Sequence, residues 1–355
     1  MRVLVAMSGG VDSSVAAALA AREHGPENVM GATLRLWGGP SDSGCCSVAD
    51  VEDARRVAER LGLVHHVFNL ADEFEERVVA PYVAGHAAGL TPNPCIECNR
   101  SIKFDRLLER ARRLGFDAVA TGHHARRETG PSGRHRLVRG ADPTKDQSYV
   151  LSMLGQDQLA RVRFPIGAMT KAEVRAEAER LGLRTAAKPD SQDVCFIRSD
   201  TGRERFLADR IDLHPGRLVD DGTGAPVGEV AAVELVTVGQ RRGMGHGTDG
   251  RRRYVTAIDV RAGEVRVGPP EAAMATGVDL HTLTWVDGPV GPGAPVVAQC
   301  SAHGVPLPAT LEDPGAPGRL RVRFDRPARR VAPGQTVALY DASDPDAVVG
   351  SGVVA

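Results

Sequence analysis

The chain has 355 residues, a length that suggests two or three compact domains. Its apolar fraction of 42% and charged fraction of 25% are those of an ordinary globular protein, and the sequence holds no bilayer-spanning apolar stretch, which excludes a membrane role. The formal net charge is −1, so a nucleic-acid partner would have to be held by a local basic face.

The first half of the chain alternates strand-like runs with amphipathic helical segments. This pattern predicts an α/β fold with a parallel sheet and helices on both faces. Strands are expected at Val3–Met7, Met30–Leu36, Val64–Asn69 and Ala118–Thr121, and helices at Ser13–Arg22, Ala49–Leu61 and Ile102–Leu114. Because the chain enters a strand at once, we expect no signal peptide and a cytoplasmic location.

The second half of the chain has a different composition and residue pattern. After about Leu213, glycine and proline recur and short valine-rich runs alternate with turns, which predicts two small β-rich domains. The runs are Val233–Val238, Tyr254–Val260 and Leu320–Phe324. We interpret Asp287–Pro295 as a linker between two β units. The predicted domains are residues 1–208, 209–275 and 276–355.

The strongest local signal is Ser8–Ser14 (SGGVDSS), which leaves the first predicted strand and opens the first helix. Its glycines allow a tight turn, and its hydroxyls and the helix N-terminus form a cradle for phosphate oxygens. The stretch lacks the Gly-Lys-Ser/Thr ending of a Walker-type loop. It resembles the pyrophosphate loop of the PP-loop ATP pyrophosphatases. That resemblance implies ATP as cofactor, AMP transfer with pyrophosphate release, and Mg²⁺ near Asp12.

Three of the six cysteines stand out by their placement. Cys95 and Cys98 share a C-x-x-C on a proline-rich loop, and Cys195 follows about 100 residues later. They could form one reactive centre, or they could be three separate buried thiols. The remaining cysteines, Cys45, Cys46 and Cys300, are interpreted as structural or peripheral.

Basic residues offer further candidates. Lysine occurs only at Lys103, Lys145, Lys171 and Lys188, mostly beside the motifs. The pair His123–His124 follows a predicted strand, where ligand sites of open α/β sheets gather, although exposed histidines would look the same.

Arginines recur at Arg241–Arg242, Arg251–Arg253 and, in alternation, at Arg319, Arg321, Arg323, Arg326, Arg329 and Arg330. This alternation predicts that the arginines lie on one face of a strand. That face could bind an RNA backbone, or the strand could simply be exposed to solvent.

Five motifs, SGGVDSS, TPNPCIECN, ATGH, KDQSY and DSQDVCF, together resemble the bacterial tRNA-specific 2-thiouridylases in order and separation. The resemblance implies a tRNA-uridine 2-sulfurtransferase that thiolates the first anticodon uridine of the tRNAs for lysine, glutamate and glutamine. It also implies a sulfur donor, either a cysteine desulfurase or a relay protein.

Carried over position by position, the resemblance makes Cys98 the nucleophile and Cys195 the persulfide-bearing cysteine, a pair able to form a disulfide. The implied ATP contacts are Ala6, Met7, Ser8, Gly9, Gly10, Val11, Asp12, Ser13, Leu34 and Gly122. The implied RNA contacts are Asn93, Pro94, Cys95, His123, Lys145, Asp146, Gln147 and Gln335.

Many family members have an aspartate where this chain has Cys95, so two mechanisms stay open. Either Cys195 carries a persulfide, or Cys95, Cys98 and Cys195 hold a four-iron four-sulfur cluster that carries the sulfur. Two other classes of protein also stay open. One is a PP-loop ligase acting on a small molecule, and the other is an RNA-binding module with a structural zinc for which His123 is the fourth ligand.

Overall fold

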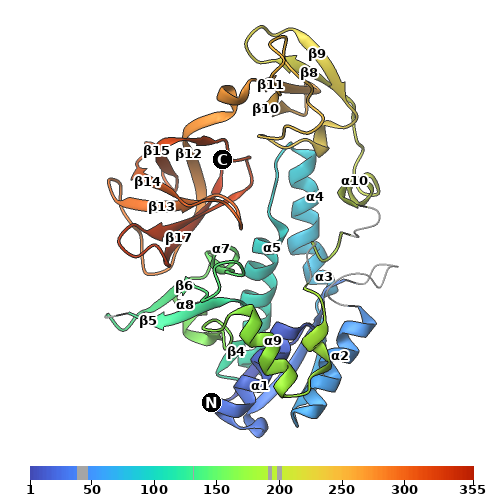
Figure 1. Cartoon of the computed structure of the whole chain (residues 1–355), viewed down its shortest axis with the longest axis vertical. Helices are drawn as coiled ribbons and strands as arrows, with labels where there is room; N and C mark the ends of the chain where they lie inside the picture. Colours follow the sequence, from blue (N-terminus) through green and yellow to red (C-terminus); the bar gives the residue numbers. More distant parts are fainter. Residues whose placement is uncertain (38–46, 131, 191–193, 198–201) are drawn as a thin grey trace.

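The computed structural model describes residues 1–37, 47–130, 132–190, 194–197 and 202–355 (Figure 1). Cys45 and Cys46 lie outside the described residues. The described residues form three sheets: a parallel sheet, a small central sheet, and a closed barrel that extends into a hairpin. Within the described ranges, no helix has the length and apolar character needed to cross a membrane.

The first sheet has five parallel strands in the order β3-β2-β1-β4-β7. The strands are β1 (Val3–Ala6), β2 (Val29–Arg35), β3 (Val64–Asn69), β4 (Ala118–Ala120) and β7 (Val162–Arg163). Side chains alternate across this sheet, because Val3 and Val5 join one buried cluster and Leu4 joins another. The predicted α/β class is therefore confirmed, with both faces of the sheet covered.

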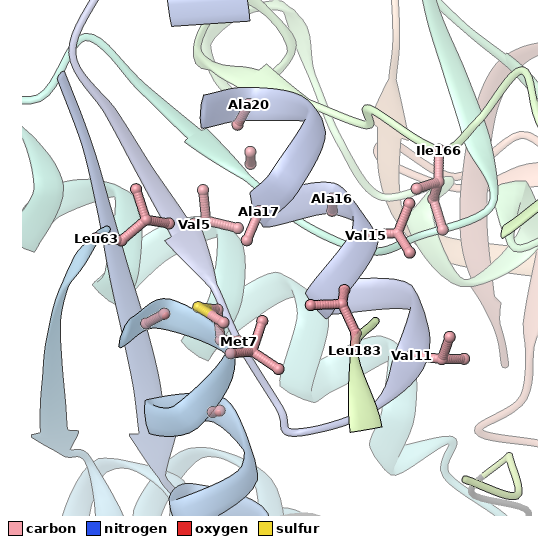
Figure 2. Close-up of a cluster of buried hydrophobic side chains, with 14 of the residues drawn as sticks. Val5, Met7, Val11, Val15, Ala16, Ala17, Ala20, Leu63, Ile166 and Leu183 are labelled. Carbon is pink, nitrogen blue, oxygen red and sulfur yellow. The ribbon is translucent and has the colours of Figure 1, made fainter. Parts of the chain in front are cut away.

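Helices α1 (Val11–His24), α2 (Val48–Arg60) and α9 (Lys171–Arg180) cover one face. Figure 2 shows their shared core, in which Val5 and Met7 lie among side chains of α1 and Leu63. The remaining short helices are η1 (Pro26–Asn28), α7 (Ser148–Leu151), α8 (Gln156–Arg161), η4 (Arg184–Ala187) and α10 (Gly202–Ala208), and η4 contributes Ala186 to the same core.

Two long helical runs cover the other face, and each has a π-helical middle. The first is α3 (Ala71–Phe74), η2 (Glu75–Val79) and α4 (Ala80–Ala87), and the second is α5 (Pro94–Glu97), η3 (Cys98–Arg106) and α6 (Leu107–Arg113). The predicted helix at Ile102–Leu114 therefore starts eight residues earlier, at Pro94. Asn93 explains this start, because its side chain accepts hydrogen bonds from the first helical amides.

The central sheet has the order β10-β11-β8-β9. Its strands are β8 (Gly216–Asp220), β9 (Pro226–Val230), β10 (Tyr254–Asp259) and β11 (Glu264–Gly268), followed by η6 (Pro270–Ala273). The strand expected at Val233–Val238 is wrong, since Val233–Leu235 is the 3₁₀-helix η5. Val233 and Val236 are buried on one side of that turn, and a short apolar run does not distinguish such a turn from a strand.

The barrel consists of six antiparallel strands and is closed by pairing of β12 with β17. They are β12 (Met274–Trp285), β13 (Pro295–Gln299), β14 (Leu307–Glu312), β15 (Leu320–Arg329), β16 (Thr336–Asp341) and β17 (Ala347–Val354). The predicted linker at Asp287–Pro295 is thus wrong, because this segment joins β12 to β13 of the same barrel. Glycine and proline suit a long barrel loop as well as a linker.

A hairpin from the first half of the chain extends the barrel sheet. Strands β5 (Ala125–Thr129) and β6 (His135–Arg139) pair with each other, and β6 pairs with β17 through Leu137 and Val138 (Figure 1). Both residues are buried at this junction. The α/β part and the barrel therefore share one continuous eight-stranded sheet.

This junction predicts a stability effect. Leu137 is fully buried, so Leu137→Ala should lower the free energy of unfolding by about 2–5 kcal/mol through the cavity it leaves. Urea denaturation followed by circular dichroism measures the change. Val305→Ala is the control, since Val305 is 78% exposed and should shift the free energy by no more than about 0.5 kcal/mol. Equal effects would contradict the junction's role.

Candidate functional site

A cavity of about 780 Å³ lies at the carboxyl ends of β1, β2 and β4, where ligands bind in open α/β sheets. Most predicted nucleotide contacts line it: Ala6, Met7, Ser8, Gly10, Val11, Asp12, Ser13, Leu34 and Gly122. Predicted RNA contacts that line it are His123, Lys145, Asp146 and Gln147. Other predicted site residues, all described, lie outside its lining: Gly9, Asn93, Pro94, Cys95, Cys98, Cys195 and Gln335.

The phosphate loop between β1 and α1 is held by close backbone contacts. Gly9 has φ +73°, and a Cβ there would lie 2.2 Å from the carbonyl oxygen of Asp50. A Cβ on Gly122, after β4, would lie 2.6 Å from the backbone of Asp12 and Ser13. Gly10 has no side chain to cap α1, and Gly10, Val11, Asp12 and Ser13 line the cavity, so the first amides of this helix are available to an anion.

All four lysines of the chain line the cavity. Lys188 Nζ donates to the carbonyl oxygen of Gly9 at 3.0 Å and to Asp50 and Asp53 of α2 at 2.6 and 2.8 Å. Burial lowers the pKa of Lys188, but these carboxylates outweigh burial and raise it above its ordinary value. The cation therefore ties the phosphate loop to the N-terminal turns of α2.

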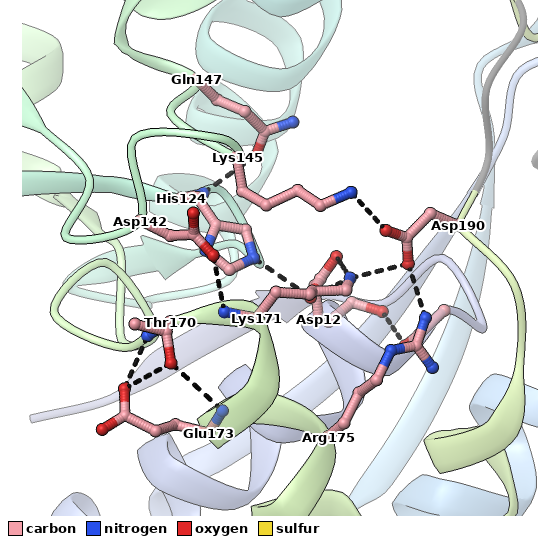
Figure 3. A network of polar contacts seen from close by, with 12 residues as sticks. Asp12, His124, Asp142, Lys145, Gln147, Thr170, Lys171, Glu173, Arg175 and Asp190 are labelled. Atoms are coloured by element: carbon pink, nitrogen blue, oxygen red, sulfur yellow. Dashed lines mark hydrogen bonds and ion pairs between the residues drawn. The ribbon is translucent and has the colours of Figure 1, made fainter.

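A second ionic network connects residues of the cavity lining (Figure 3). Lys171 Nζ lies 2.8 Å from both Asp12 oxygens and 2.8 Å from Asp190 Oδ1. Asp190 also pairs with Lys145 at 2.8 Å and with Arg175 at 2.9 Å. Burial raises the pKa of Asp190, but hydrogen bonds from Lys145 and Lys171 outweigh it and bring the pKa to about 2. Asp190 therefore stays ionised at neutral pH.

Asp12 is a carboxylate of the cavity lining that lies in the phosphate loop itself. Burial raises its pKa, but hydrogen bonds from His124 and Lys171 outweigh burial and lower it. An ionised carboxylate beside a phosphate cradle suits Mg²⁺, which commonly takes one or two protein carboxylates plus substrate phosphates.

The two histidines behave differently. His123 is buried, its Nδ1 lies 2.8 Å from the Thr121 hydroxyl, and its ring packs against Phe104 and Phe164. Burial, followed by the charge of Lys103, holds its pKa well below the ordinary value, so the ring is neutral. The ring of His124 lies 3.2 Å from Asp12, and its backbone exchanges two hydrogen bonds with Gln147. The sequence placed both histidines at a candidate ligand site without separating their roles, and in the structure His124 contacts Asp12.

Cys98 and Cys195 lie in an apolar cluster that shares Leu34 and Leu36 with the cavity lining. Cys98 is buried at the start of η3, Cys195 is half-buried, and both pack into one apolar cluster. Asn99, beside Cys98, donates to the carbonyl oxygen of Val150, a lining residue, at 2.9 Å, and Lys103 on the same helix lines the cavity. The helix that carries Cys98 is therefore part of the cavity's wall.

The structure does not assemble the predicted metal sites. In the part of the chain that the structure describes, no group of three histidine, cysteine or acidic side chains is placed to hold a metal ion. Cys95 is exposed whereas Cys98 is buried. In the described residues, these side chains therefore form neither an assembled three-thiolate set nor a zinc site completed by the buried His123.

The loop before the cysteines is held by the barrel. The side-chain amide of Gln335 donates to the carbonyl oxygen of Thr91, and the Thr91 amide donates to Pro333 at 2.8 Å. Gly334, with φ +86°, lies close to the backbone of Thr91 and Pro92. Gln335, predicted as an RNA contact, therefore braces the segment that leads to Cys98.

The arginine face is less basic than its sequence suggests. Arg321 pairs with Asp279 at 2.9 Å, and Arg323 pairs with Glu312 at 2.6 Å. These two cations are neutralised by neighbouring strands, so Arg321 and Arg323 do not form a surface of uncompensated positive charge.

Comparison with known proteins matches the whole chain. Family models described as "tRNA methyl transferase HUP domain", "tRNA methyl transferase PRC-barrel domain" and "Aminomethyltransferase beta-barrel domain" match residues 1–199, 204–269 and 276–354. A "tRNA-specific 2-thiouridylase MnmA" of Roseiflexus sp. is 47% identical over 378 residues, covering 100% of this chain and 99% of the relative. A protein of the same name from Kineococcus radiotolerans is 49% identical, covering 96% and 95%. An NMN synthetase of Francisella tularensis has a TM-score of 0.33 at 18% identity, covering 54% and 66%.

The tight approach at Gly9 predicts a matched pair of variants. Gly9→Ala should abolish binding of an ATP analogue, because its Cβ collides with the Asp50 backbone. Gly62→Ala has nearly the same φ, +70°, but open space around it, and should cost only about 1–2 kcal/mol of stability while binding is kept. Isothermal titration calorimetry measures both affinities. Equal affinity in the two variants would contradict the close-packed loop.

Proposed function

The chain belongs to the family of tRNA-specific 2-thiouridylases, and on that premise we propose that it uses ATP to replace the C2 oxygen of a tRNA uridine with sulfur. One observation carries the proposal: the helix that bears Cys98 forms a wall of the phosphate-loop cavity, and Cys195 packs into the same cluster as Cys98. The proposed target, taken from the resemblance, is the first anticodon uridine of the tRNAs for lysine, glutamate and glutamine.

The chemistry explains why an ATP site and thiols belong together. A uracil C2 oxygen is a poor leaving group, so direct attack by sulfur has a prohibitive barrier. Once that oxygen attacks the α-phosphorus of ATP, pyrophosphate leaves and the oxygen becomes part of a bound adenylate. The same oxygen then departs as AMP, and a thiolate or persulfide is nucleophilic enough near neutral pH to displace it.

The cavity supplies electrostatic stabilisation for the adenylation step. The amides at the start of α1 and the hydroxyl of Ser13 would bind phosphate oxygens, and Lys171 and Lys145 would balance charge that develops on pyrophosphate. Asp12 would hold Mg²⁺, which neutralises phosphate charge when it is bound. His124 and Lys171 keep the Asp12 carboxylate ionised and oriented for this role.

The proposed sulfur transfer uses Cys195 and Cys98. A donor, either a cysteine desulfurase or a relay protein, would load Cys195 with a persulfide. Its terminal sulfur attacks C2 of the adenylated uracil, which forms a C–S bond and expels AMP. The Cys98 thiolate then attacks Sγ of Cys195, so that the S–S bond to the base breaks, 2-thiouridine leaves and a Cys98–Cys195 disulfide forms. An external dithiol reduces this disulfide before the next cycle.

The main proposal predicts the loss of one nucleoside. tRNA from cells lacking this protein should contain no 2-thiouridine at the first anticodon position, as measured by mass spectrometry of digested tRNA. Re-expression of the wild-type chain should restore it, and Cys195→Ser should not. In vitro, Cys195→Ser should still release pyrophosphate with tRNA present, since adenylation precedes sulfur transfer. Intact 2-thiouridine in the deletion strain would refute the proposal. Pyrophosphate release without RNA would instead favour a ligase that acts on a small molecule.

Cys95 separates the persulfide route from a cluster route. The persulfide route predicts that Cys95→Asp keeps tRNA thiolation within about threefold of wild type, since a carboxylate is no worse for an exposed position outside the reacting pair. A cluster held by three thiolates would lose a ligand and its activity. Thiolation assays and an iron assay on anaerobically purified protein measure both. Stoichiometric iron that disappears in Cys95→Asp would overturn the persulfide route.

A further inference from the structure

The barrel reaches the nucleotide cavity through one tight loop. Ala302 and His303, in the turn Ser301–Gly304 between β13 and β14, are part of the cavity lining, although the rest of the lining comes from residues 6–190. The Gly304 amide donates to the carbonyl oxygen of Ser301 at 3.0 Å, which closes the turn. A second domain therefore contributes to the walls of a site that the phosphate loop dominates.

Gln299 fixes this turn in place. It is 3% exposed, and its side-chain nitrogen donates to the carbonyl oxygens of Ser301 at 3.0 Å and Ala302 at 3.1 Å. Its side-chain oxygen accepts from Arg139 Nη2 at 2.7 Å. Every hydrogen-bonding atom of the Gln299 amide group is thus used, and the position of the loop depends on Arg139.

Arg139 stands at the end of β6 and contacts both domains at once. Its Nη1 donates to Asp146 at 2.8 Å, its Nε donates to the carbonyl oxygen of Pro345 at 3.3 Å, and its guanidinium lies 3.9 Å from the ring centre of Tyr340. The planar fork of arginine allows these simultaneous contacts, which a lysine ammonium does not reproduce.

Asp146 links Arg139 to the turn that carries Lys145 and Gln147. Its carboxylate accepts from the amides of Gly140 and Ser148, both at 3.0 Å, and from the Ser148 hydroxyl at 2.8 Å. With the bond from Arg139, these contacts fix the turn that presents Lys145 and Gln147 to the cavity. The side chain of Asp146, predicted as an RNA contact, is thus occupied within the protein.

We propose that the loop Ser301–Gly304 is a wall of the adenylation chamber, and that Arg139 is the positioning residue that sets this wall against the Lys145–Gln147 turn. The inference rests on the proposed function, because it places the incoming RNA base between the barrel loop and the nucleotide. ATP itself binds mainly to the phosphate loop, so Arg139 acts on the step that needs RNA and ATP together.

The sharpest test is Gln299→Glu. The second carboxylate oxygen repels the carbonyls of Ser301 and Ala302, while the contact with Arg139 becomes an ion pair, so the loop is released and the domain junction is kept. We expect the kcat of tRNA-dependent pyrophosphate release to fall about tenfold or more, and the affinity for an ATP analogue to change less than about twofold. Arg139→Lys should lower kcat similarly.

Two further variants keep the test decisive. Arg136→Ala is the matched control, since Arg136 on the same strand pairs with Asp344 of the same barrel but bonds neither Gln299 nor Asp146. It should leave kcat near the wild-type value.

His303→Ala changes only an exposed side chain on the wall, so the fold is not at stake, and it should raise the KM for tRNA by about threefold or more. Wild-type kinetics in both Gln299→Glu and His303→Ala would overturn the proposal, as would an equal loss in Arg136→Ala.

Hydrogen exchange separates this inference from the proposed function. Bound tRNA together with a non-hydrolysable ATP analogue should slow amide exchange in residues 301–304 of the wild type, and Gln299→Glu should speed it in the absence of ligand. These results do not require RNA chemistry. If the wild type releases no pyrophosphate with tRNA but shows this protection, the proposed function is refuted, whereas the proposal that residues 301–304 form a wall of the chamber is kept. Absence of protection together with normal tRNA activity would refute the wall alone.

Discussion

The close approach of three backbone segments at the phosphate loop is the constraint on which the rest of the site depends. Gly9 touches the first turn of α2, and Gly122 brings the end of β4 against the start of α1. Lys188 then bonds the Gly9 carbonyl and two acids of α2 at once. Because glycine alone fits these contacts, they restrict the backbone of a loop whose residues line the cavity.

Charge balance within the cavity follows from that geometry. The lysines at positions 145 and 171 are paired with Asp190 and Asp12, so the site holds its cations without an uncompensated buried charge. A triphosphate offers the same lysines stronger acceptors, and a compact ammonium can be shared between a carboxylate and a phosphate oxygen. This explains why a chain rich in arginine keeps its few lysines for this cavity.

The sequence predicted those parts of the fold that rest on local patterns. The strands and helices from Val3 to Arg60 and the phosphate loop follow from periodicity and from glycine placement, and the structure contains them. Contacts between distant segments were missed, since no local pattern records that β6 pairs with β17 or that Asp287–Pro295 stays within one barrel. The ion pairs of Arg321 and Arg323 were also not visible in the sequence, because their acidic partners lie on other strands.

Motif residues fall into two physical groups that the sequence does not separate. Lys145 and Asp12 present charge to the cavity. The other group has its polar side chains occupied within the protein: Asn93 caps a helix, Asp146 holds a turn, and Gln335 holds the loop before Cys98. A residue of the second kind acts on a substrate through what it positions. The barrel thereby contacts both the cysteine loop, through Gln335, and the nucleotide cavity, through Gln299. Since one barrel makes both contacts, displacing it would disturb the proposed adenylation and the proposed sulfur transfer together, so the proposal ties both chemical steps to a single domain arrangement.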